Sequence, residues 1–189
     1  MELTKEQLLQ IMPTATKRAD KYLPYLNKAM AEFAISIDPV RMAHFLAQIA
    51  HESGEMRYVK ELASGKKYEG REDLGNTKPG YGVKYKGRGF MQLTGFANYR
   101  KYKMYCGYDV TGKPELLEQP KGATRSAAWF WQRGKSVDLN HVADGDDGRN
   151  SYEICRQITK HINGRYNGIE SRWAYTQKAL KVLDAFKFK

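Results

Sequence analysis

The sequence is poor in cysteine and has no long hydrophobic run. Its longest apolar stretch, Ala43 to Ala50, contains two polar residues and is far shorter than the roughly 20 residues that a membrane span needs. We therefore expect no membrane insertion. The two cysteines, Cys106 and Cys155, form neither a CxxC pair nor part of a His/Cys cluster. Since a chain of 189 residues can bury a core without disulfide staples, we interpret both as reduced residues in or near that core.

Histidine is also scarce, with four residues in the chain, and the motifs that contain it do not fit a metal site. His51-Glu52 begins like the helix of a zinc protease, but Glu55 occupies the position that the second histidine requires. The loop at 144–148 resembles the start of a calcium loop, yet Cys155 stands where its last glutamate should be. We expect neither a metal nor a cofactor.

Acidic residues are outnumbered by basic ones, 21 to 32, which gives a formal net charge of +11. This excess favours a polyanionic partner, and nucleic acid, an anionic membrane surface and an anionic cell-wall polymer all qualify. The basic residues form no tail; at 99–105 they alternate with tyrosines. Charge therefore leaves open a non-catalytic module that binds nucleic acid or cell wall, as well as a positive surface that is merely solvated.

Hydrophobic periodicity is helical along most of the chain. It predicts helices at 4–12, 19–33, 38–53, 95–106, 123–132 and 150–163, and a last helix that carries Trp173, Leu180, Leu183 and Phe186. Pro24 is expected to begin a second helix or to kink a single one. A glycine-rich loop at 65–95 contains a predicted short hairpin from Tyr81 to Thr94. Without a repeat or linker, residues 1–189 are predicted to form a single, mainly α domain, with no separate wall-binding domain.

Glu52 is the candidate general acid. It lies seven residues after Phe45 and three after Ile49, so its carboxylate follows the apolar stripe of the helix at 38–53. We expect partial desolvation and the negative end of the helix dipole to favour the neutral acid. A general acid that works near neutral pH needs this property. Spacing alone also allows a carboxylate that reaches solvent from a frayed helix end.

Four motifs carry a family resemblance. They are, in chain order, His51-Glu52-Ser53-Gly54, the segment Tyr85 to Gly95 with its GRG-x-x-Q-x-T pattern, Ala127 to Trp131, and Ile162-Asn163-Gly164. These motifs resemble glycoside hydrolase family 19, which holds chitinases and the chitinase-like endolysins of bacteriophages and prophages. The resemblance runs from about residue 2 to residue 183. Segments at 31–35, 68–77 and 115–120 resemble the endolysin branch.

The resemblance implies a lysozyme-like fold, with the hairpin and the glycine-rich loop beside the cleft. It implies inverting hydrolysis of β-1,4 bonds in amino-sugar polymers. Glu52 matches the general acid, and Thr94 matches the hydroxyl that helps to hold the nucleophilic water. The matching substrate-binding positions are His51, Tyr85, Arg88, Gln92, Asn98, Asn163 and Arg172.

The second carboxylate is less well defined by the sequence. Its candidates are Glu55, Glu61, Glu69, Glu72 and Asp73. On a continuous helix Glu61 would face away from Glu52, because nine residues rotate about 900°. A break at Ser53-Gly54 would instead bring Glu61 across the cleft, and the resemblance also points to Glu61 as the base. Glu69 is the alternative base, and Glu55 is interpreted as a rim charge.

These observations predict a monomeric endolysin that hydrolyses the glycan strand of peptidoglycan. A chitinase acting on β-1,4-linked N-acetylglucosamine is the alternative within the same class. The N-terminus lacks the apolar core of about 7–15 residues that marks a secretory signal. We therefore expect synthesis in the cytoplasm of the host, holin-dependent release and action on the wall in the periplasm. Nucleic acid is not the expected partner.

Overall fold

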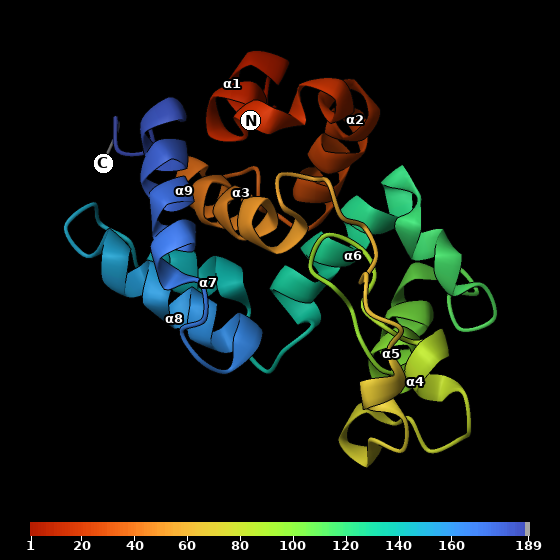
Figure 1. The fold of residues 1–189 in the computed structure, drawn as a ribbon. Helices are drawn as coiled ribbons and strands as arrows, with labels where there is room; N and C mark the ends of the chain where they lie inside the picture. The colour runs from red at the N-terminus through yellow and green to blue at the C-terminus, as the bar shows by residue number, and fades with distance from the viewer. Residues whose placement is uncertain (188–189) are drawn as a thin grey trace.

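A computed structural model describes residues 1–187 of the chain, and helices dominate it (Figure 1). The α-helices are α1 (Lys5–Ile11), α2 (Thr16–Glu32), α3 (Pro39–Ser53), α4 (Tyr81–Lys84), α5 (Phe96–Cys106), α6 (Pro120–Arg133), α7 (Leu139–Asp144), α8 (Ser151–Asn163) and α9 (Ile169–Val182). Short 3-10 turns lie at Pro13–Ala15, Lys66–Tyr68, Glu72–Leu74 and Pro114–Glu118. The prediction of a mainly α protein is confirmed.

Local capping fixes the bounds of the helix that carries Glu52. Asp38 is the N-cap of α3, and its carboxylate accepts a hydrogen bond from the Val40 N–H, while Pro39 occupies the first helical position. At the other end Gly54 adopts the left-handed conformation, with φ 56°, and ends the helix. The predicted bounds of this helix are therefore confirmed, and Glu52 lies in its last turn.

Helix α3 is the centre of the structure. Its side chains are buried on nearly all sides, and it packs against α9 and α7. Figure 1 shows α7, α8 and α9 on one side of α3 and the segment that contains α4 and α5 on the other. Trp131 of α6 packs edge-on against Phe45 and donates a hydrogen bond to Asn140, which joins α3, α6 and α7 in one core. Cys106 and Cys155 are both buried free thiols.

The predicted hairpin at 81–94 is wrong. Tyr81–Lys84 forms a helical turn instead, and residues 1–187 contain only two isolated antiparallel bridges in this region, both through Arg88. Arg88 and Leu93 exchange backbone hydrogen bonds of 3.1 and 2.8 Å across a four-residue turn. Tyr81 and Tyr85 are four residues apart, and their rings pack edge to face in a cluster with Phe96.

Pro24 neither begins a second helix nor divides the first. It lies inside α2, which runs without interruption from Thr16 to Glu32. A proline removes one backbone donor from a helix interior and strains the preceding turn. Burial of Tyr22, Leu26 and Met30 along the same helix provides packing that offsets this cost.

Glu55 is a buried structural carboxylate, which corrects its interpretation as a rim charge. Its side chain accepts hydrogen bonds from the backbone and hydroxyl of Thr14, both at 2.6 Å, and from the Tyr175 hydroxyl at 2.8 Å. Burial alone would raise the pKa of Glu55, but these hydrogen bonds outweigh it and lower the pKa. The residue thus ties the N-terminal segment to α9 directly behind the end of α3.

We expect Glu55→Gln to lower the free energy of unfolding by about 1.5–3 kcal/mol at pH 7, because hydrogen bonds to an ionised group are replaced by weaker ones. A carboxylate with a lowered folded-state pKa stabilises the fold above its unfolded pKa of about 4.3, and this contribution is lost as pH falls. The difference from wild type, measured by urea unfolding, should therefore shrink below about pH 4. Glu2→Gln, an exposed change, is the matched control. A difference that grows toward low pH would contradict this role.

Candidate active site

A groove of about 240 Å³ collects five of the predicted site residues. Its lining residues are Glu52, Leu74, Met91, Gln92, Leu93, Thr94, Asn98, Phe130, Lys135, Ile162 and Asn163. They come from the end of α3, the turn before α5, the end of α6 with the loop after it, and the end of α8. Five residues singled out in the sequence, spread over more than 100 positions, thus line one surface.

Glu52 lies at the groove with a specific partner. Its side chain is 20% exposed, and its Oε1 accepts a 2.5 Å hydrogen bond from a terminal nitrogen of Arg172, whose side chain is 2% exposed. The other terminal nitrogen of Arg172 donates to the side chain of buried Gln48, one turn before Glu52 on α3, and its Nε donates to the Asn167 carbonyl. The guanidinium is therefore fixed on three sides, and it fixes one carboxylate oxygen of Glu52. Arg172 therefore contacts Glu52 from the interior and does not line the groove, which corrects its prediction as a substrate-binding residue.

The turn before α5 and the first turn of α5 hold three of the polar groove residues. Gln92 adopts a positive φ of 50°, a conformation that side chains other than glycine rarely take. Its side-chain amide donates to the Gly89 carbonyl, the Thr94 hydroxyl donates to the Gln92 carbonyl at 2.8 Å, and Asn98 donates to the Thr94 carbonyl at 2.7 Å. These bonds hold the strained turn in one shape and present its polar side chains to the groove.

Glu61 is not among the residues that line the groove, but it is bonded to this turn. Its Oε2 accepts a hydrogen bond from the Gly87 N–H, and its Oε1 accepts from Lys67 and from the Tyr68 hydroxyl. Gly87 is also next to two groove residues, since a Cβ on Gly87 would come within 2.7 Å of the Gln92 Oε1 and 3.3 Å of the Thr94 Oγ1. The glycine therefore allows the carboxylate of Glu61 and the polar wall of the groove to approach each other closely.

The two candidate bases have different surroundings. Burial would raise the pKa of Glu61, but the bonds from Lys67, Gly87 and Tyr68 outweigh burial and lower it, so this carboxylate is ionised at neutral pH. Glu69 is exposed, and its two oxygens accept from the Gly80 and Val83 N–H groups at the start of α4. Glu69 thus caps a helical turn, which is a structural role.

Two further predicted residues lie at the edges of the site. His51 is half-buried, and its Nδ1 is 3.0 Å from the Ser171 hydroxyl. Burial and the nearby Arg172 charge lower the pKa of His51, which makes the ring neutral at pH 7. Asn163 is the last residue of α8, and both polar atoms of its side chain bond to the loop that follows. Its Oδ1 accepts from the Arg165 N–H, and its Nδ2 donates to the Asn167 carbonyl.

The structure corrects the prediction for Tyr85 and Arg88. Tyr85 is buried, and its hydroxyl donates to the Thr111 carbonyl. Arg88 is also buried and is bonded to Glu118, Tyr99 and the Lys84 carbonyl. Both residues hold the glycine-containing turn in place from the inside and do not line the groove. Sequence motifs could not separate this supporting function from substrate contact.

Sequence reasoning also missed several groove residues. Phe130 and Lys135 line one wall, and the Lys135 ammonium lies 5.4 Å from the centre of the Phe130 ring. Phe130 stands in the Ala127 to Trp131 motif, so the motif itself was a usable signal, whereas nothing in the sequence around Lys135 distinguishes it. Across residues 1–187, no group of three or more His, Cys, Asp or Glu side chains could hold a metal ion. None of the helices in that part is long and apolar enough to cross a membrane.

Comparison with known sequences gives a match across the whole chain. A glycosyl hydrolase family 19 domain-containing protein of Haemophilus influenzae is 27% identical, over 97% of this chain and 98% of the relative. An endochitinase of Arabidopsis thaliana is 35% identical over 69% of this chain and 46% of its own length. The chain thus spans less than half of the curated plant endochitinases that it matches. A scan against protein-family models gives no match.

Solved structures share the fold. Chitinase C from Streptomyces griseus superposes with a TM-score of 0.75 at 22% identity, covering 96% of this chain and 76% of that one. A bacterial family 19 chitinase gives 0.77 at 21% identity, covering 95% and 94%. The fold class and the order of the motifs thus agree with the full-length sequence match. Together these findings show that the chain is similar in sequence to a glycoside hydrolase family 19 domain along almost its whole length and shares the fold of family 19 chitinases.

Proposed function

We propose that this protein hydrolyses β-1,4 bonds of the glycan strand of bacterial peptidoglycan by an inverting, two-carboxylate mechanism. The catalytic part of this proposal rests on one observation. A single groove is lined by Glu52, Gln92, Thr94, Asn98 and Asn163. The similarity to a glycosyl hydrolase along almost the whole chain argues against a non-catalytic binding module. The net charge of +11 favours an anionic wall polymer over neutral chitin as the substrate.

Glu52 supplies the proton in this mechanism. Arg172 donates to the Oε1 of Glu52. Within residues 1–187 no hydrogen bond to Oε2 is found, so in this proposal Oε2 is the oxygen that protonates the leaving group. When the proton moves to the glycosidic oxygen, Glu52 becomes a carboxylate. The adjacent guanidinium stabilises that new charge without having to move.

Glu61 acts as the base. An inverting reaction needs an ionised carboxylate that activates water on the face of the sugar opposite the acid, at a separation of about 6.5–9.5 Å. The lowered pKa of Glu61 keeps it ionised. In this proposal the Thr94 hydroxyl helps to hold the water that Glu61 activates, which is supported by the closeness of both residues to Gly87.

Chitin hydrolysis is the second candidate. It is favoured by the plant relatives and by the matching solved structures, which are chitinases. Both polymers contain β-1,4-linked amino sugars, so the same acid and base would serve either one. For the peptidoglycan function we further propose synthesis in the cytoplasm and holin-dependent release to the wall.

Digestion of purified peptidoglycan and of chitin oligosaccharides side by side tests the substrate. We expect new reducing ends from peptidoglycan, identified by mass spectrometry, and a loss of about 10²–10⁴-fold in rate for Glu52→Gln, because the amide cannot donate the proton. Circular dichroism should show an unchanged fold. More than a tenth of the wild-type rate in this variant would rule out Glu52 as the acid, and turnover of chitin alone would select the second candidate.

The base assignment is tested by comparing Glu61→Gln with Glu69→Gln. The first should lose nearly all turnover, because an amide cannot take a proton from water. The second should keep most activity, because Glu69 caps α4 and a glutamine can still accept from one N–H. Initial rates at saturating substrate measure both. The reverse order would transfer the role of base to Glu69.

Thr94→Val should reduce turnover while leaving substrate affinity largely unchanged, since it removes one hydroxyl at almost constant volume. Thr94→Ser is the matched control, because it restores the hydroxyl. Separate determination of kcat and KM distinguishes the two effects. Equal kcat values for the valine and serine variants would make Thr94 a structural residue of the turn.

A further inference from the structure

A second recessed surface lies away from the groove, and we call it the tyrosine face. It consists of Tyr25, Lys28, Tyr105, Tyr108, Lys121 and Arg125. Its three tyrosines are between 37% and 44% exposed, an unusual accumulation of large rings on one part of a protein surface. None of its residues lines the groove that holds Glu52.

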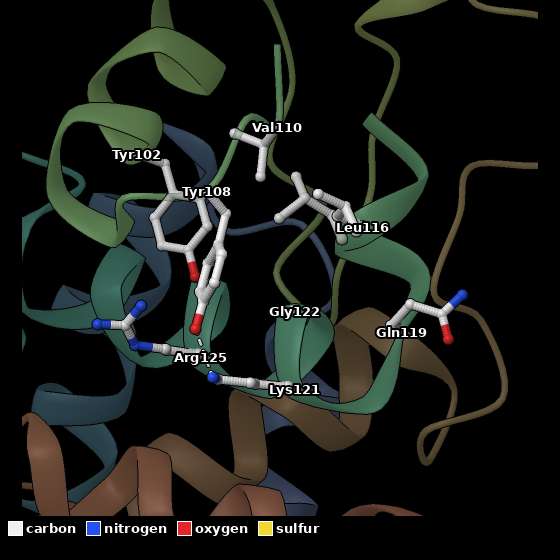
Figure 2. A pocket seen from close by; sticks show the side chains of 9 residues that line it. Tyr102, Tyr108, Val110, Leu116, Gln119, Lys121, Gly122 and Arg125 are labelled. Carbon is white, nitrogen blue, oxygen red and sulfur yellow. Dashed lines mark hydrogen bonds between the residues drawn. The ribbon is translucent and has the colours of Figure 1, made fainter. Parts of the chain in front are cut away.

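Two hollows meet on this face. One, of about 240 Å³, is walled by Tyr102, Val110, Leu116 and Leu117 and is almost entirely apolar (Figure 2). The other, of about 550 Å³, includes Tyr25 and Lys28. Both are bounded by Tyr108, Lys121 and Arg125, so they form one continuous depression.

The positive charge of the tyrosine face is available to a ligand. Glu32, its acidic neighbour, is already bound to Arg125 at 2.7 Å and accepts from the Tyr105 hydroxyl. Lys121 donates to the Tyr108 hydroxyl, as Figure 2 shows, but an ammonium has three donors and can use the others outward. Lys28 is exposed. Two lysines therefore flank an exposed tyrosine ring beside an apolar hollow.

Helix α6 separates the two surfaces. Lys121 and Arg125 are four residues apart and share one side of the helix, whereas Phe130, which lines the groove, is rotated by about 140° from Arg125. A ligand on the tyrosine face would therefore leave the groove open. The two sites can act on one polymer at the same time.

We propose that the tyrosine face is an accessory binding site for the peptidoglycan strand, and this inference rests on the proposed function. Tyrosine rings stack on the apolar faces of sugars, the apolar hollow accommodates the methyl of an N-acetyl group, and Lys28 and Lys121 pair with carboxylates of the stem peptides. Peptidoglycan offers all three features, whereas chitin lacks the carboxylates. A second attachment point raises the local concentration of polymer at the groove.

Binding to purified peptidoglycan sacculi, measured by pelleting in the Glu52→Gln background, tests this site without catalysis. We expect Lys28→Glu with Lys121→Glu to weaken binding at least about tenfold, and Tyr108→Ala to weaken it as well. The matched control is Lys17→Glu with Lys181→Glu, two exposed lysines elsewhere that change the net charge equally. The control should keep most of the affinity.

The same charge changes in the active enzyme provide the second measurement. Clearing of sacculi should fall, while turnover of soluble chitin oligosaccharides, which occupy only the groove, should stay at the wild-type rate. The proposal would be overturned if the tyrosine-face and control variants bound sacculi with equal affinity. It would also be overturned if the turnover of the soluble substrate fell as much as the clearing of sacculi, or if the protein with an unaltered surface did not bind sacculi. Binding through this face without hydrolysis of sacculi would refute the proposed function and leave the accessory site standing.

Discussion

The buried guanidinium of Arg172 is the interaction on which the site depends. A charge with 2% side-chain exposure is tolerated only where it is paired and fully hydrogen-bonded, and Arg172 meets this condition with Glu52, Gln48 and the Asn167 carbonyl. Because Glu52 and Gln48 stand on α3 while Arg172 stands on α9, the same contact joins the two helices that pack at the centre of the fold. The position of the acid and the packing of the core are therefore coupled.

A second constraint acts through the backbone near Gly87. Polar side chains approach this residue from one side and the Glu61 carboxylate binds its N–H from the other, so a side chain at this position would separate them. Arg88 supports the turn from the interior through Glu118 and Tyr99. The turn is thus held from two sides, as the proposed role of Thr94 in holding a water molecule would require.

Charge is used in two ways by this protein. In the interior it is local and paired, as at Glu55, whose hydrogen bonds lower its pKa. On the surface it is distributed, and the excess of basic residues attracts a polyanion from a distance set by ionic strength. The first kind fixes the positions of buried side chains, and the second kind would assist the encounter with the proposed anionic polymer.

The sequence by itself determined the longer helices, the capping of α3 and the motifs that carry the family resemblance, because these depend on periodicity and on residues close in the chain. It did not predict the short helices α4 and α7. It marked Glu52 from the apolar stripe alone. Tertiary structure decided the rest: whether Pro24 interrupts a helix, whether Tyr85 is buried or exposed, and whether Glu55 is a rim charge or a buried acceptor. Each of these depends on contacts with distant segments, such as Thr14 and Tyr175 around Glu55, and local sequence carries no information on such partners.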